Sequence, residues 1–211
     1  CKPFVMNHPR LRRFLEGDPR GKRVVVLAGT GGNGGGGLVC ARRLHNWGAL
    51  AAVITTRPLD QYRGVPAHQL DILKRIGVPV QEGASFLRTN QNPPAELIID
   101  ALIGYSLSGA PQGTAAELIQ WTNRQSAPVL SLDTPSGLEA TRGEVLQPAV
   151  RADATLTLAL PKTGFQNPDA SEYLGELYLA DLSIPAELYA RPPLNLQVGA
   201  IFAEHEILKI R

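Results

Sequence analysis

The chain has 211 residues, of which 44% are hydrophobic and 19% charged, values typical of a folded globular protein and not of a disordered one. Its net charge of +2 and aromatic content of 6% give no support for a nucleic-acid or membrane partner. Two cysteines are too few for a disulfide framework or a four-cysteine zinc site, so we expect a reducing, cytoplasmic location. The length favours one domain, and we expect residues 1–211 to form it.

The first half alternates apolar runs with amphipathic segments. Residues 24–28 and 50–55 are apolar and rich in β-branched side chains, which predicts two buried strands. Helices are predicted over 38–47 and 66–76, because each segment has one apolar face and ends before a glycine, Gly48 and Gly77 respectively.

The second half continues the alternation. Strands are predicted over 97–100, 128–132, 154–158 and 177–182, and helices over 115–123 and 185–189. Strands joined by helices of this length form right-handed crossovers, which predicts a doubly wound α/β fold with a mainly parallel sheet and helices on both faces. Ligands bind such Rossmann-like sheets at the carboxyl ends of the strands, so the residues that follow each strand are the candidate site.

A glycine run, Gly29 to Gly37, follows the first predicted strand and contains a G-x-G-x-x-G pattern. Glycines let backbone N–H groups approach an anion, and the start of the next helix adds a partial positive charge. A flexible linker is the alternative, disfavoured because ordering so many glycines costs entropy. The acid that dinucleotide-binding folds place about 20 residues further on is absent, and Thr55, Thr56 and Arg57 stand there instead.

Two acids and a lysine follow later strands. Asp100 and Asp133 each end a predicted strand, so we expect both carboxylates to face the same crevice. The alternative for each is a turn-forming or helix-capping role. Lys162 follows another strand and is able to pair with an acid or a phosphate.

Four segments match a known pattern in order and spacing: residues 29–42, 100–109, 132–137 (with Asp-Thr-Pro-Ser-Gly) and 155–164. Together they resemble the YjeF N-terminal domain family, the NAD(P)H-hydrate epimerases. The resemblance covers most of the chain, and it implies the family's Rossmann-like fold and a homodimer.

The resemblance also implies site residues. A potassium ion would be held by oxygen ligands of Asn33, Asp100 and Ser136, which suit an alkali cation better than zinc. The residues implied to contact substrate are Gly32, Asn33, Gly34, Gly35, Gly36, Gly104, Tyr105, Ser106, Leu107, Ser108, Gly109, Ala110 and Asp133. The chain departs from the family at Gly32 and Gly36, where the family has Asn and Asp, so one substrate-facing carboxylate is missing.

The resulting functional hypothesis is an isomerase that interconverts the R and S forms of hydrated NADH and NADPH. Asp133 would carry the proton that lets the ring hydroxyl leave as water, and Lys162 would orient it. Opening of the ring to an aldehyde would serve equally well. The alternative is a module of the same family that binds a nucleotide or serves as a scaffold without catalysis.

Overall fold

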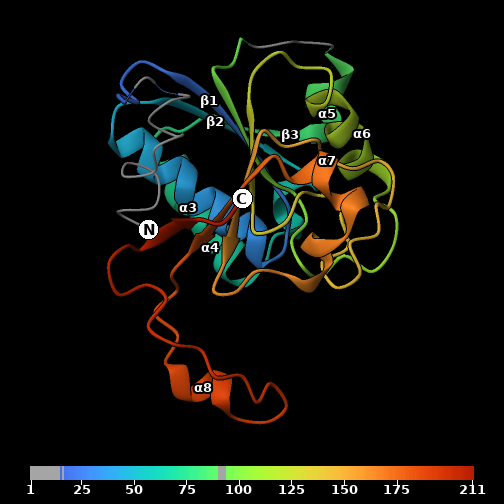
Figure 1. Cartoon of the computed structure of the whole chain (residues 1–211). Helices are drawn as coiled ribbons and strands as arrows, with labels where there is room; N and C mark the ends of the chain where they lie inside the picture. The colour runs from blue at the N-terminus through green and yellow to red at the C-terminus, as the bar shows by residue number, and fades with distance from the viewer. Residues whose placement is uncertain (1–14, 16, 90–93) are drawn as a thin grey trace.

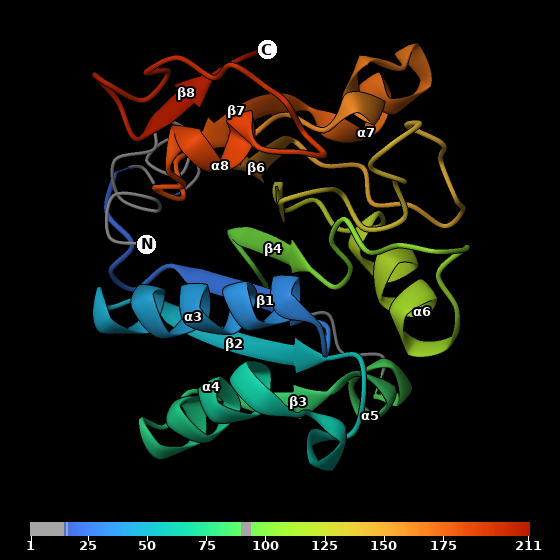
Figure 2. The same ribbon diagram turned by 90° about the horizontal axis from the view of Figure 1, so that it is seen from below.

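One sheet runs through the whole described part of the chain. The structure, a computed structural model, describes residues 15, 17–89 and 94–211. The strands are β1 (Arg23–Ala28), β2 (Leu50–Thr55), β3 (Val80–Glu82), β4 (Leu97–Ala101), β5 (Val129–Leu132), β6 (Ala154–Leu158), β7 (Glu176–Ala180) and β8 (Ile207–Lys209). Their order in the sheet is β3-β2-β1-β4-β5-β6-β7-β8, and only the pairing of β7 with β8 is antiparallel within this sheet. The predicted doubly wound, mainly parallel α/β fold is confirmed (Figures 1 and 2).

Helices cover both faces of the sheet. The α-helices are α3 (Gly32–Asn46), α4 (Gly64–Arg75), α5 (Gly83–Arg88), α6 (Gly113–Thr122), α7 (Ser171–Leu174) and α8 (Ala186–Ala190). Three 3₁₀ turns add η1 (Leu59–Gln61), η2 (Thr163–Gln166) and η3 (Pro168–Ala170). Helices α3 and α4 lie on one face, whereas α5 and α6 lie on the other (Figure 2). Among the described helices none is long and apolar enough to cross a membrane.

Strand β1 shows why the sheet is apolar on both sides. Val24 and Val26 belong to the core cluster under α3 and α4, while Val25 and Leu27 belong to the cluster under α5 and α6. Side chains alternate between the faces of a strand, so a strand covered on both sides must be apolar at every position. This alternation explains the continuous apolar run from which the strand was predicted.

The glycine run forms a helix and not a loop. Helix α3 begins at Gly32, whereas the sequence predicted a start at Leu38. Glycine is a poor helix former, so tertiary contacts decide this start. A Cβ at Gly34 would lie 1.8 Å from the Gly29 carbonyl oxygen, and one at Gly37 would lie 2.5 Å from the Ala101 Cβ. The two glycines therefore let the helix lie directly against the ends of β1 and β4.

Several short elements were not predicted. They include the three-residue edge strands β3 and β8 and the helices α5 and α7. Beyond β7 the chain forms an arm that carries α8 away from the body of the domain before it returns as β8 (Figure 1).

Candidate active site

The carboxyl ends of the central strands open into one large cavity. Its volume is about 820 Å³, within the range of small-molecule sites. It is lined by Thr30, Gly31, Gly32, Asn33, Gly36, Val39, Cys40, Arg43, Thr56, Arg57, Leu102, Ile103, Gly104, Tyr105, Ser106, Gln112, Gly113, Thr114, Ala115, Leu130, Leu132, Asp133, Leu156, Leu158, Asp181 and Leu182. Much of the lining comes from the segments after β1, β2, β4 and β5, where the doubly wound fold predicts a ligand, and the rest from α3, β5, β6 and the segment after β7.

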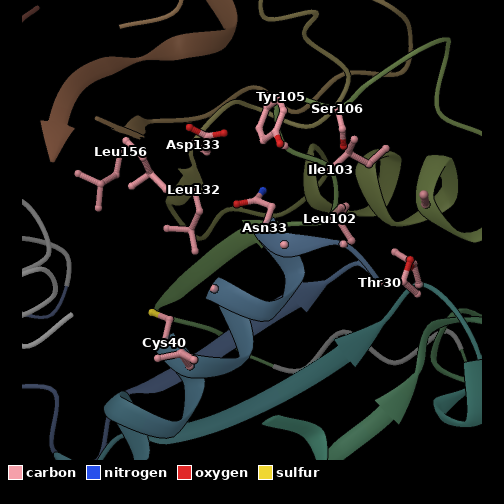
Figure 3. A pocket seen from close by; sticks show the side chains of 18 of the residues that line it. Thr30, Asn33, Cys40, Leu102, Ile103, Tyr105, Ser106, Leu132, Asp133 and Leu156 are labelled. Carbon is pink, nitrogen blue, oxygen red and sulfur yellow. The ribbon is translucent and has the colours of Figure 1, made fainter. Parts of the chain in front are cut away.

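The cavity has an apolar region and a polar region. The apolar region lies between α3 and strands β5 and β6, and it includes Cys40, Leu132 and Leu156 (Figure 3). Burial raises the pKa of the Cys40 thiol to about 12, so this group is an apolar wall and not a nucleophile. The polar region lies where α3 begins, close to Asn33 and Tyr105 (Figure 3). A ligand with one apolar end and one polar end matches this division.

The first turn of α3 presents free backbone donors to the polar region. Its N-cap, Gly31, has no side chain to bond them, and no acidic residue lies in the first turn. Gly31, Gly32 and Gly36 line the cavity, and a Cβ at any of them would meet no atom within 4 Å. The start of a helix favours an anion through these N–H groups and the helix dipole.

Asp133 and Lys162 form an ion pair beside the cavity. The Lys162 Nζ lies 2.8 Å from Asp133 Oδ1, and the side chains are 20% and 8% exposed. Lys162 also donates hydrogen bonds to the carbonyl oxygens of Leu158 at 3.1 Å and Leu160 at 3.4 Å, which hold the ammonium beside the carboxylate. The structure thus brings together Asp133 and Lys162, the two residues that the functional hypothesis names as catalytic.

The backbone of Asp133 is in the left-handed region, with φ of 64°. Its N–H donates to the Leu156 carbonyl oxygen at 2.8 Å, which ties the end of β5 to β6. Aspartate tolerates this conformation better than most non-glycine residues, because its short side chain bonds locally. Asp133 directly follows Leu132, and both residues line the cavity (Figure 3).

Asp100 lies beneath the cavity and does not line it. Its side chain is fully buried and accepts four hydrogen bonds: from Ser131 Oγ (2.8 Å), Ser136 N (2.9 Å), Ser136 Oγ (2.6 Å) and Leu102 N (3.2 Å). Burial raises the pKa of this carboxyl above its ordinary value, and the hydrogen bonds from Ser136 and Ser131 oppose that rise. The network joins the ends of β4 and β5 and fixes the floor of the site.

Ser136 connects this floor to the loop after β4. Its hydroxyl accepts a hydrogen bond from the Ile103 N–H at 2.9 Å and lies 3.1 Å from the Ile103 carbonyl oxygen. Gly104 follows, and a Cβ there would lie 3.0 Å from the Asn33 Cβ, so the glycine admits the Asn33 side chain. Asn33 Nδ2 is buried without a hydrogen-bond partner among the described residues.

The residues expected to contact substrate divide into two groups. Gly32, Asn33, Gly36, Gly104, Tyr105, Ser106 and Asp133 line the cavity. The glycines Gly34 and Gly35 are buried in α3, and Leu107, Ser108, Gly109 and Ala110 continue the loop beyond the lining. The sequence reasoning did not single out Ser131, Thr114 or Gln112, since nothing in an isolated serine or in the start of a helix marks it as part of a site.

No cluster of three or more His, Cys, Asp or Glu suited to a metal is found in the described ranges. The expected cation ligands are the amide oxygen of Asn33, the hydroxyl of Ser136 and the carboxylate of Asp100, so only one of them is an acid. That donor set suits a hard, singly charged cation and not zinc.

Comparisons with known proteins place this architecture. A family model described as "YjeF-related protein N-terminus" matches residues 7–164. An NAD(P)H-hydrate epimerase of Dehalogenimonas lykanthroporepellens is 44% identical over 190 residues, which cover 90% of this chain and 74% of that protein. One of Rhodopirellula baltica is 31% identical over 165 residues, 78% of this chain and 68% of that protein.

Two further matches are a longer, bifunctional relative and a solved structure. A bifunctional NAD(P)H-hydrate repair enzyme of Moorella thermoacetica is 33% identical over 189 residues, and the chain spans only 36% of its length. The crystal structure of the yeast protein ynu0 superposes with a TM-score of 0.78 over 99% of this chain and 87% of that one. At 24% identity, this last likeness speaks for the fold.

Proposed function

The chain belongs to the YjeF-related N-terminal domain family, and from that premise we propose that it is an isomerase, an NAD(P)H-hydrate epimerase. The observation that supports this most directly is the Asp133–Lys162 ion pair, whose aspartate lines the cavity. Relatives whose names give this activity match most of the chain. The substrates proposed are the R and S forms of hydrated NADH and NADPH.

The chemistry requires a proton at one oxygen. The hydrated nicotinamide ring bears a hydroxyl on a carbon bonded to the ring nitrogen. When an acid protonates the hydroxyl, the nitrogen lone pair forms a C=N bond and the C–O bond breaks, releasing water. The planar iminium then accepts water on either face and returns the proton, which interconverts the epimers without any net change in oxidation state.

We assign the proton transfer to Asp133. Its carboxyl group, protonated from solvent, gives the proton to the leaving hydroxyl and regains one from the water that adds to the iminium. The Lys162 ammonium at 2.8 Å stabilises the carboxylate between these two steps. The hydrogen bonds of Lys162 to the Leu158 and Leu160 carbonyls hold the ammonium in place through both states. The apolar wall of Leu132 and Leu156 lies beside Asp133 and suits the flat ring.

A potassium ion is proposed at Asn33, Asp100 and Ser136. The buried Asn33 amide, with no partner for its nitrogen, supports this placement, because the amide in the opposite orientation presents its carbonyl oxygen instead. Asp100 is buried without an ion-pair partner in the described part of the chain, so a cation would offset the cost of its charge. The ion would supply positive charge for the phosphates of the substrate.

The binding-only alternative is not favoured. It rests on Gly32 and Gly36, which leave the cavity without the family's Asn and Asp side chains. Against it stand the retained Asp133–Lys162 pair and the names of the relatives. A homodimer, a cytoplasmic location and a single domain over residues 1–211 stay predictions.

The test is epimer interconversion. The R and S hydrates are separated by chromatography, one is incubated with the protein at neutral pH in potassium, and the appearance of the other is followed against a protein-free sample. We expect a faster approach to equilibrium with the protein. A rate equal to that of the protein-free sample, together with calorimetric binding of the nucleotide, would favour the binding-only alternative.

A further inference from the structure

The cavity extends from Asp133 to a second polar end at β2, which the proposed reaction does not use. Strand β2 pairs in parallel with β1, and Thr55 lies opposite Ala28 at their carboxyl ends. The strand order reverses between β1 and β4, which makes this the switch point of the sheet. Thr56 and Arg57, directly after β2, line the same cavity as Asp133. A ligand that reacts at Asp133 and crosses the switch point therefore reaches β2 with its other end.

The backbone around Arg57 is held firmly. The Thr55 hydroxyl donates to the Arg57 carbonyl oxygen at 2.9 Å, and the Thr56 N–H donates to the Ala28 carbonyl oxygen at 3.1 Å. The Tyr62 hydroxyl donates to the same Ala28 oxygen at 2.7 Å. These bonds fix where the Arg57 side chain leaves the backbone. The side chain itself is exposed at the cavity and makes no ion pair with any residue in the described ranges.

The start of helix α6 lies close to the carboxyl end of β2 and lines the same cavity as Arg57. Gln112, Gly113 and Thr114 line the cavity, and Gly83 adjoins both the Thr55 carbonyl oxygen and the Thr114 methyl group. Helix α6 has no acidic residue in its first turn and no side-chain cap. Its dipole therefore adds to the positive charge of Arg57 at this end of the cavity.

In dinucleotide-binding folds, the side chain at the end of the second strand distinguishes NAD from NADP. An acid at this place binds the hydroxyls of the adenosine ribose, whereas an arginine accommodates a 2′-phosphate. Here the residues are Thr55, Thr56 and Arg57, with no acid among them. A phosphate monoester carries between one and two negative charges at neutral pH, and a guanidinium bonds its oxygens in pairs.

We propose that Arg57 determines the substrate specificity of this chain and selects the hydrate that bears a 2′-phosphate. This inference rests on the proposed function. The hydrate derived from NADPH is then the preferred substrate over the one derived from NADH. Arg57 acts on binding at the end of the cavity remote from Asp133, so it changes which nucleotide is held and not how the ring reacts.

The test measures binding without turnover. Calorimetry gives the dissociation constants of 2′-phospho-ADP-ribose and of ADP-ribose for the wild-type chain and for Arg57→Gln. Arg43→Gln is the matched control, because Arg43 lines the same cavity from the last turn of α3, roughly 16 Å along the helix axis from Gly32. Arg75→Gln removes an equal charge from an exposed ion pair with Asp71, outside the cavity lining.

We expect the wild-type chain to bind the phosphorylated probe about tenfold or more tightly, and Arg57→Gln to lose most of that ratio. The ratio should persist in Arg43→Gln and Arg75→Gln. An equal loss in Arg43→Gln would assign the preference to net charge and overturn the proposal, as would a ratio near one in the wild type. If the ratio behaves as expected but no epimerisation occurs, the proposed function fails while the role of Arg57 stands.

Discussion

Lys162 Nζ lies 2.8 Å from Asp133 Oδ1, and the same ammonium bonds the carbonyl oxygens of Leu158 and Leu160. The two residues come from the ends of adjacent strands, β5 and β6. Their pairing follows from the parallel sheet, which gathers the carboxyl ends of its strands on one side. Substitution of each partner in turn separates the catalytic role of the pair from its contribution to stability.

Asp133→Asn should lower the epimerisation rate by roughly 10²–10⁴-fold, because an amide cannot carry the proton. The fold should be retained, since asparagine tolerates a φ of 64° as well as aspartate does. The rate is measured with separated epimers, and nucleotide affinity is measured by calorimetry. Asp169→Asn, an exposed residue of η3, is the matched control. A wild-type rate in Asp133→Asn would remove Asp133 from the mechanism.

Lys162→Met should lower the free energy of unfolding by about 1–3 kcal/mol, less than for a fully buried pair because the lysine side chain is 20% exposed. The loss arises because Asp133 would keep its charge in an apolar wall without a partner. The double variant Asp133→Asn/Lys162→Met should lose less than the sum of the single changes. Urea unfolding measures all three, and strict additivity would show that the pair does not contribute to stability.

Potassium should raise the melting temperature. At ten times its dissociation constant, a cation bound only by the folded state contributes about 1.4 kcal/mol, which corresponds to roughly 3–6 °C for a chain of this size. Asn33→Ala should abolish the shift because it removes a proposed ligand from the cavity. Melting curves are compared in potassium chloride and choline chloride at equal ionic strength. An equal shift in both salts would argue against a specific site.

Gly36→Ala should raise the free energy of unfolding by roughly 0.5–1 kcal/mol, because a Cβ there meets no neighbour and alanine favours the helix. Gly34→Ala should lower it by about 1–3 kcal/mol or more, because its Cβ would lie 1.8 Å from the Gly29 carbonyl oxygen. The two substitutions are chemically identical, so each is the control of the other in urea unfolding. Stabilisation by both would contradict the close approach of α3 to the end of β1.

The stability of the fold should fall at alkaline pH in a way that Cys40→Ala removes. The unfolded thiol ionises near the ordinary pKa of 9.0, whereas in the folded chain the pKa is about 12. Above pH 9 the unfolded state therefore binds fewer protons than the folded state, and the wild-type chain loses about 1.4 kcal/mol per pH unit relative to Cys40→Ala. The loss ends near pH 12. Urea unfolding between pH 8 and pH 10.5 measures the difference. A difference that does not change with pH would show that Cys40 ionises equally in both states.

The sequence predicts the sheet well because its strands are apolar on both faces. It misplaces the start of α3 because glycine propensity favours a loop, while the contacts that allow a helix at Gly34 and Gly37 are tertiary. Asp133 and Lys162 could be assigned from their positions after strands. The burial of Asp100 could not, because it depends on the hydroxyl of Ser131, one serine within an apolar strand.

The two edges of the sheet bear on how copies of the chain would associate. Strands β3 and β8, which form these edges, are each three residues long, and they include Glu82 and Lys209. Short edge strands with charged side chains offer few free N–H and C=O groups to another strand. Extension of the sheet from one copy to the next is therefore disfavoured, which protects the chain from aggregation through its edges. A homodimer would have to form through side-chain packing of helices or loops.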